Sequence, residues 1–143
     1  MNISHPVLIG LFFLSSFALC GQTDLENHSK IAKTLSFYLN GGTNNDFETL
    51  SKAFHPTATM KFIDGEGNYK EVNALEFFKK GMKPGPKSDR KTRIVAINTS
   101  GTAASAQLEI EYDTFFFIDY MHLLLVEGEW KIVSKIFYKK EKS

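Results

Sequence analysis

The chain is poor in cysteine and carries almost no net charge. A single cysteine, Cys20, occurs in 143 residues, which excludes a framework of disulfide bonds. The 17 basic and 16 acidic side chains leave a formal net charge of +1. Nucleic-acid-binding domains usually carry a strong basic excess, so we expect no nucleic-acid partner. Aromatic residues make up 13% of the chain, which excludes an intrinsically disordered composition.

The sequence also lacks the common signatures of metal and cofactor sites. Its four histidines lie at positions 5, 28, 55 and 122, and no two of them have the spacing of a metal-binding pair. No glycine-rich phosphate loop follows a predicted strand, and no Ser-x-Gly elbow indicates a hydrolase. We therefore expect neither a metal site nor a cofactor.

Charge is absent from the first 22 residues, where Val7–Leu19 forms a largely apolar run of 13 residues. A membrane-spanning helix needs about 20 apolar residues, so this run predicts no membrane span. It fits the hydrophobic region of a secretory signal peptide, and Ala18 and Cys20 place small residues at the −3 and −1 positions of a cleavage site. The sequence predicts a cleaved signal peptide over residues 1–20, a single domain over residues 21–143, and a secreted or periplasmic protein.

Two features of this segment leave an alternative open. Residues 1–6 contain no lysine or arginine, whereas signal peptides usually begin with a basic region. Cys20 could also be a lipid-modified cysteine, although Leu19 is larger than the residue that usually precedes one. Lipoprotein anchoring through Cys20 is therefore the alternative to a released protein. If the segment is removed after Cys20, the mature chain has no cysteine.

Apolar residues at steps of three and four predict an amphipathic helix over residues 25–40, which the glycine pair at 41–42 ends. Residues 44–46 predict the cap of a second, short helix. His55-Pro56 is expected to end this helix, because the residue before a proline avoids the α conformation. The buried face of the first helix is expected to carry Ile31, Leu35, Tyr38 and Leu39.

A third helix is predicted over residues 74–82, with Asn73 as its cap. The segment that follows, residues 83–89, contains Pro84 and Pro86 and is predicted to be a loop. Arg90 and Arg93 follow this loop. They would either bind an anionic ligand at the mouth of a pocket or lie in solvent.

Apolar–polar alternation predicts strands in the rest of the chain. A two-residue turn at Glu127-Gly128 would pair Leu125 with Trp130, and it would then place Ile136 opposite Asp119 and Ser134 opposite Met121. Runs of helix followed by runs of strand indicate an α+β fold, in which a curved antiparallel sheet wraps over three helices. The predicted strands cover residues 57–63, 69–72, 92–99, 104–112, 115–126 and 130–138.

The order of elements, together with Asn44–Phe47 and Ala53–Ala58, resembles the nuclear-transport-factor-2-like (NTF2-like, SnoaL-like) superfamily of cone-shaped, cystatin-like α+β domains. Lys83–Arg90 and Gly128–Val133 are similar to the bacterial subfamily labelled "putative lumazine-binding protein". The resemblance covers nearly all of residues 25–139. It implies a pocket between the sheet and the helices.

The same superfamily contains ketosteroid isomerases and polyketide-cyclase-like enzymes. The resemblance implies that Tyr38 and Asp119 occupy the positions of the isomerases' two oxyanion donors. The position of the catalytic base holds Phe62 instead, and only Asp64 or His55 could act as a displaced base. Two hydrogen-bond donors without a base hold an oxygen atom but transfer no proton, so this pattern favours binding over isomerisation.

Asp119 is the only acidic or strongly basic residue between Thr114 and Val126. A carboxyl group in so apolar a strand needs a ligand or a partner, such as Lys135, Arg93 or a hydroxyl group. Alternation places Met121 on the same face as Asp119. The predicted ligand-binding residues are Tyr38, Phe62, Asp119, Met121 and Trp130.

The opposite face of the last strands is also apolar and needs a cover. We expect a homodimer through this outer face, an arrangement that the superfamily commonly uses. The leading hypothesis is an exported dimer that binds a small apolar molecule in its cone. The alternatives are an isomerase- or cyclase-like enzyme and an interaction module whose pocket is filled by side chains. The outer face is predicted to carry Phe116, Ile118, Tyr120, Leu124, Val133 and Phe137.

Overall fold

A computed structural model describes residues 16–143. The expected signal-peptide residues before Ser16 lie outside this range. The elements in chain order are α1 (Ser16–Thr43), α2 (Phe47–Ser51), β1 (Phe54–Ile63), β2 (Tyr69–Asn73), α3 (Ala74–Gly81), β3 (Lys91–Ser100), β4 (Ala103–Glu111), β5 (Phe115–Val126) and β6 (Glu129–Glu141).

The six strands form one sheet in the order β2-β1-β6-β5-β4-β3. All neighbouring strands are antiparallel except β1 and β6, which are parallel because the chain crosses from one side of the sheet to the other between them. The last four strands follow one another as a meander. This topology confirms the predicted α+β fold with a curved sheet, which is unclosed. The parallel β1–β6 pair departs from the wholly antiparallel sheet that the sequence predicted.

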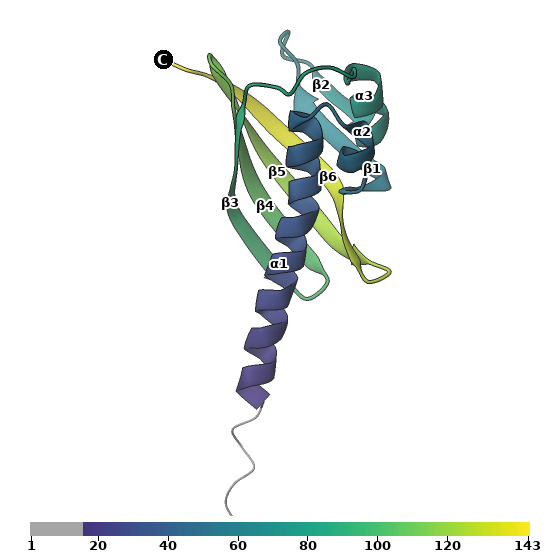
Figure 1. Cartoon of the computed structure of the whole chain (residues 1–143), viewed down its shortest axis with the longest axis vertical. Coiled ribbons are helices and arrows are strands. Elements are labelled where there is room, and N and C mark those ends of the chain that lie inside the picture. The colour runs from purple at the N-terminus through teal and green to yellow at the C-terminus, as the bar shows by residue number, and fades with distance from the viewer. Residues whose placement is uncertain (1–15) are drawn as a thin grey trace, which may run out of the picture.

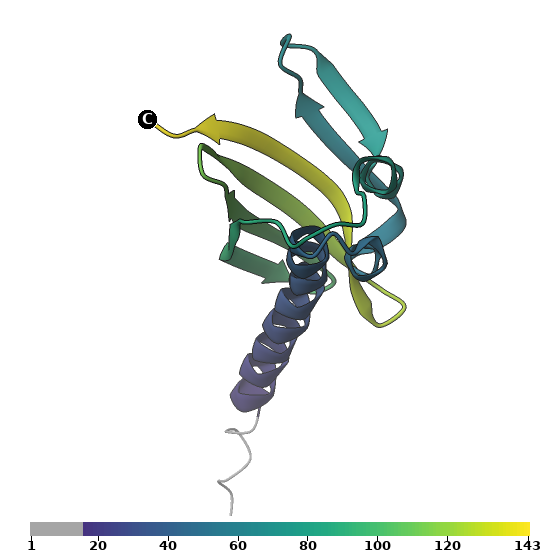
Figure 2. The ribbon, with the colours of Figure 1, turned by 45° about the horizontal axis from the view of Figure 1, so that its top comes forward.

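The helices lie against the inner face of the curved sheet (Figure 1). α1 crosses β3–β6, and its first turns project beyond the sheet. The β1–β2 arm bends away from the other four strands, and α2 and α3 lie in the angle between them (Figure 2). No helix within residues 16–143 is long and apolar enough to span a membrane.

The predicted stripe of the first helix is buried: Ile31, Leu35, Tyr38 and Leu39 are each at most 5% exposed. The helix does not end at Gly41-Gly42, however, but continues to Thr43. Gly41 is required by packing rather than by helix termination, because a Cβ atom there would lie 2.4 Å from the backbone nitrogen of Leu50. This close approach lets α2 pack directly against the end of α1.

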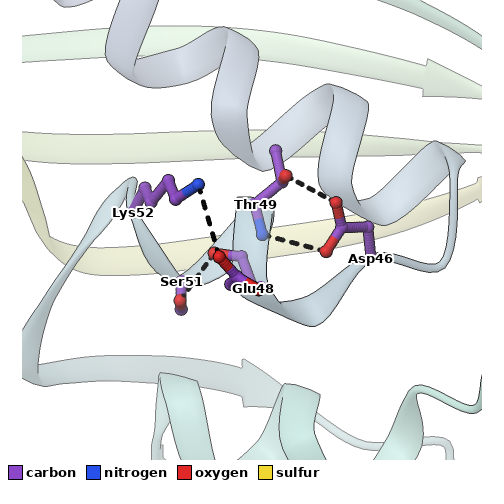
Figure 3. Close-up of polar contacts among 5 residues, drawn as sticks. All are labelled: Asp46, Glu48, Thr49, Ser51 and Lys52. Atoms are coloured by element: carbon purple, nitrogen blue, oxygen red, sulfur yellow. Dashed lines mark hydrogen bonds and ion pairs between the residues drawn. The ribbon is translucent and has the colours of Figure 1, made fainter.

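Asp46 caps α2 as expected. Its carboxylate accepts hydrogen bonds from the backbone N–H of Thr49 at 3.0 Å and from the Thr49 hydroxyl at 2.5 Å (Figure 3). Lys52 and Ser51 both contact Glu48, through its carboxylate and its backbone carbonyl respectively. These local contacts stabilise a helix of only five residues.

The prediction that His55-Pro56 ends the second helix is wrong. α2 ends at Ser51, and His55-Pro56 lies within β1. The sheet tolerates the proline because β1 pairs with β6 at Phe54 and again only from Thr59, so the residues between lie at an irregularity in the ladder.

The third helix and the turn of the last hairpin agree with the sequence prediction. The side chain of Asn73 accepts a hydrogen bond from the Glu76 backbone N–H at 3.0 Å and so caps α3. Glu127 and Gly128 both have positive φ angles, 51° and 84°, as in a two-residue hairpin turn. Leu125 pairs with Trp130 as predicted.

Beyond this turn the predicted register fails. His122 pairs with Ser134 but Leu123 pairs with Ile132, so Val133 is an extra residue in β6, a β-bulge. The bulge reverses the alternation of every later residue in β6. Lys135 therefore pairs with Met121, and the residue opposite Asp119 is Phe137 rather than Ile136.

The reversed alternation also corrects the predicted faces of β6. Lys135 is 4% exposed and lies on the inner face, whereas Ile136 is 44% exposed and lies on the outer face. Phe137 likewise belongs to the inner face, where it packs against the core. A local irregularity of one residue thus decides which charged side chain enters the interior.

Candidate functional site

A cavity of about 320 Å³ lies between the inner face of the sheet, the last turns of α1, α3 and the 82–90 loop. Aromatic side chains from α3, β5 and β6 form much of its wall. This volume falls at the lower end of the range for small-molecule pockets, about 300–1,000 Å³. The lining residues include Leu50, Met60, Phe77, Phe78, Met82, Ile110, Phe117 and Phe137, with Tyr38, Ser88, Arg90, Tyr112, Asp119 and Lys135 as polar members.

Tyr38 and Asp119 meet at the wall of this cavity. The Tyr38 hydroxyl donates a hydrogen bond of 2.7 Å to Oδ2 of Asp119. Tyr38 is 5% exposed and Asp119 is completely buried. The tyrosine proton thus points at the carboxylate, and the two residues do not act as a pair of donors toward a third atom.

Lys135 is the partner of Asp119. Its ammonium group forms an ion pair with Oδ1, the carboxylate oxygen that Tyr38 does not use. Lys135 Nζ also lies 4.7 Å from the ring centre of Phe137 and 5.5 Å from that of Tyr38, close enough for cation–π attraction. Both oxygens of Asp119 are therefore occupied by side chains of the protein.

Burial shifts the protonation equilibria of the two partners of Asp119. Burial and the nearby Asp119 carboxylate raise the pKa of Tyr38 well above 10. Burial lowers the pKa of Lys135, and the attraction of Asp119 opposes this shift only in part. Tyr38 is therefore neutral throughout the physiological range and acts as a hydrogen-bond donor.

Arg90 lies at the wall where the 82–90 loop meets α1. It donates three hydrogen bonds of 2.9–3.1 Å, to the Thr43 hydroxyl, the Tyr112 hydroxyl and the Leu39 carbonyl. Gly42 makes room for it, because a Cβ atom there would lie 2.4 Å from a guanidinium nitrogen of Arg90. The two arginines after the loop thus differ: Arg93 forms an ion pair with Glu109 and does not line the cavity.

Three of the predicted ligand-binding residues lie elsewhere. Phe62 stacks on Phe137, with 5.0 Å between the ring centres, and does not itself line the cavity. Met121 is fully buried in the core and does not line the cavity. Trp130 lies before the bulge and pairs with Leu125 as predicted. Its side chain lines a separate groove between α1 and the β5–β6 hairpin.

The two candidate bases also lie outside the cavity lining. The Asp64 carboxylate accepts hydrogen bonds from the backbone of Asn68 and Glu66 in the β1–β2 turn and pairs with Lys70 at 3.3 Å. The Asn68 N–H, aided by Glu66 and Lys70, lowers the pKa of Asp64. His55 contacts Thr57 instead. Within residues 16–143 no cluster of three potential metal ligands occurs.

The cavity residues that sequence reasoning missed come from two sources. The sequence names Lys135 as one possible partner of Asp119, but a regular β6 would turn it to the outer face, and only the bulge brings it inward. Phe77, Phe78 and Met82 line the cavity because α3 lies in the angle between the β1–β2 arm and the rest of the sheet. The helical pattern of residues 74–82 predicts that Phe78 and Met82 face inward, but it does not indicate that this face lines a cavity. Only the three-dimensional angle of this arm reveals that placement.

Breaking the buried ion pair is expected to destabilise the protein strongly. Each single variant, Lys135→Met or Asp119→Asn, leaves the other member of the pair buried without its partner. Each should lower the free energy of unfolding by about 3–5 kcal/mol. The double variant Asp119→Asn/Lys135→Met should lose at least about 2 kcal/mol less than the sum of the single losses. Urea denaturation of the four proteins gives this coupling energy.

The exposed pair Glu26–Lys30, with a distance of 2.7 Å, provides the matched control for this cycle. Its coupling should be far smaller than that of the buried pair, because solvent screens two exposed charges on one helix. A coupling between Asp119 and Lys135 no larger than that of the control pair would contradict the buried ion pair.

The raised pKa of Tyr38 predicts that the free energy of unfolding decreases as the pH rises above 10. Above pH 10 the unfolded chain loses the tyrosine proton while folded Tyr38 keeps it, so the stability of the wild type falls as pH rises. The stability difference between the wild type and Tyr38→Phe should be constant from pH 7 to 9 and then shrink by up to about 1.4 kcal/mol per pH unit. Denaturation curves at these pH values measure it, and a difference that stays constant to pH 11 would argue against the buried hydrogen bond.

Comparisons with known proteins show which family this chain belongs to. The family model described as "Putative lumazine-binding" matches residues 26–138. An NTF2-like protein of unknown function from Shewanella baltica is 30% identical, with a TM-score of 0.75 over 82% of this chain and 97% of that one. Another from Methylobacillus flagellatus is 29% identical, with a TM-score of 0.70 over 80% and 92% of the two chains.

A more distant structure shares the fold alone. A ketosteroid isomerase-like protein from Erwinia carotovora has a TM-score of 0.61 over 78% of this chain and 94% of that one, at 12% identity. Comparison with functionally curated proteins returned no match. The extent of the family match and the likeness to the Shewanella structure decide the assignment: this chain belongs to the "Putative lumazine-binding" family of the NTF2-like superfamily.

Proposed function

We propose that this protein is an exported dimer that binds a small, mostly apolar molecule in the cavity of its cone. The observation that carries this proposal is a cavity of about 320 Å³ with an aromatic wall and a single buried polar cluster, Tyr38–Asp119–Lys135. Pockets of this kind hold a ligand by its apolar body and orient it by a few fixed polar groups. A cavity that held only water would have no need of so apolar a wall.

The alternatives fit this geometry less well. An interaction module with a pocket filled by Phe and Met side chains would leave no cavity of this volume. An isomerase-like reaction needs a base beside the substrate, and the only carboxyl group in the cavity lining within residues 16–143 is Asp119. Both of its oxygens already contact Tyr38 and Lys135, which favours binding over proton abstraction.

The proposed dimer uses the outer face of the sheet. Tyr120 and Ile136 form a cross-strand pair there, and each is 44% exposed. Leu124 and Tyr138 extend the same apolar surface, with 42% and 65% exposure. An apolar patch on a curved sheet favours a two-fold contact with a second copy, since the same surface then covers itself.

Export rests on the sequence of the first residues. The apolar run Val7–Leu19 and the small residues before Gly21 support cleavage by a signal peptidase. Lipid attachment to Cys20 would instead leave the protein on a membrane surface. The mass of the mature N-terminus distinguishes the two.

Native mass spectrometry of the protein purified from its own host tests all three parts of this proposal. We expect a dimer whose chains begin at Gly21 and which carries an additional small mass. Met82→Trp places a large ring in the cavity wall and should remove that mass. Tyr69→Trp, at a residue on the exposed β2 strand that is 61% exposed, is the control and should retain it.

Each part of the result has a contrary outcome. A wild-type protein without any bound mass would contradict the binding function. Equal ligand loads in Met82→Trp and the wild type would place the ligand outside the cone. A monomer would contradict the proposed use of the outer sheet face.

A further inference from the structure

The charges that line the cavity are unequal in number. Lys83, Arg90 and Lys135 contribute three cations, and Asp119 contributes the single carboxylate. Asp119 pairs with Lys135, which leaves the other two cations without a carboxylate partner among residues 16–143. Lys83 is exposed, so water screens its charge. Arg90 is half-buried, so it is the cation of the cavity wall whose charge no carboxylate balances.

Arg90 is held in place without being neutralised. Its three hydrogen bonds go to two hydroxyl groups and one carbonyl oxygen, all of them uncharged acceptors. A guanidinium group has five N–H donors, so at least two remain for another acceptor. Arg93 shows the contrasting arrangement, because it forms an ion pair with Glu109 on the exposed edge of the sheet.

Lys135 also has unused N–H donors, and it is more deeply buried than Arg90. An ammonium group carries three N–H donors, and the one charged contact of Lys135 within residues 16–143 is its ion pair with Oδ1 of Asp119. The other close neighbours of Nζ are the ring faces of Phe137 and Tyr38, which attract a cation but are poor hydrogen-bond acceptors. Because buried donors are normally satisfied, a side chain that is only 4% exposed and lines the cavity favours an oxygen acceptor within that cavity.

We propose that the ligand of the cone is an apolar, flat anion, such as an aromatic carboxylate, whose charged oxygen accepts hydrogen bonds from Lys135 while Arg90 offsets its charge. This inference rests on the proposed binding function and adds the ligand's chemical class. The aromatic rings of Phe77, Phe78, Phe117 and Phe137 fit a flat apolar body. The excess of cations selects an anion over a neutral molecule of the same shape.

A matched pair of probes tests the charge preference directly. 2-Naphthoate is an anion at pH 7, and 2-naphthamide has the same shape without the charge. Titrations of the full mature protein followed by calorimetry should give a dissociation constant at least tenfold lower for 2-naphthoate. The preference should fall to less than threefold in the double variant Asp119→Asn/Lys135→Met, which removes the ammonium group without leaving a carboxylate unpaired.

The arginine pair supplies a second, milder comparison. Arg90→Gln should lower the ratio of 2-naphthamide to 2-naphthoate dissociation constants several-fold, because the loss of its charge affects the anion more than the neutral probe. Arg93→Gln removes an equal charge outside the cavity and should leave this ratio unchanged. Thermal unfolding of each variant verifies that the protein is folded before its affinity is compared.

The outcomes separate this inference from the binding function on which it rests. Equal affinity for the two probes, or tighter binding of 2-naphthamide, would overturn the anion preference and leave the binding function in place. A preference that persists unchanged in the double variant would overturn the role of Lys135. Failure of both probes to bind at millimolar concentration would overturn the binding function and this inference together.

Discussion

The site depends on one interaction, the buried contact of Asp119 with Lys135 and Tyr38. Asp119 is completely buried, and moving a carboxylate out of water costs several kcal/mol unless other groups replace the lost hydration. Lys135 supplies a charge to one oxygen, and the Tyr38 hydroxyl donates to the other. This cluster joins α1, β5 and β6 at the wall of the cavity, so the packing of the first helix on the sheet and the chemistry of the pocket share the same three side chains.

The β-bulge at Val133 is what makes that interaction possible. A regular β6 strand would turn Lys135 to the outer face and leave Asp119 facing Phe and Met side chains without a cation. With the bulge, Lys135 and Phe137 both turn inward, and Ile136 joins Tyr120 on the outer face. One extra residue thereby separates the two functions proposed for the sheet, a polar cluster inside and an apolar contact surface outside.

Much of the fold follows from the sequence because local patterns determine it. The stripe through Ile31 and Leu35, the cap at Asn73 and the turn at Glu127-Gly128 each depend on neighbouring residues alone. The bulge and the placement of Arg90 do not, because they are fixed by contacts between distant segments that alternation and spacing leave open. The resemblance implied that Tyr38 and Asp119 both donate to a ligand oxygen. In the structure Tyr38 instead donates to Asp119, and Lys135, one of the partners that the sequence offered, pairs with the other carboxylate oxygen.

The most direct test of this account is an NMR measurement of the neighbours of Lys135 in the purified protein. With the bulge at Val133, the account predicts nuclear Overhauser effects from the Lys135 side-chain methylenes to the rings of Tyr38 and Phe137, together with methylene shifts moved upfield by these rings. Contacts from Ile136 to the Tyr38 ring, with Lys135 methylenes at solvent-exposed shifts, would contradict it. That result would mean an unbulged strand and an Asp119 without its cation.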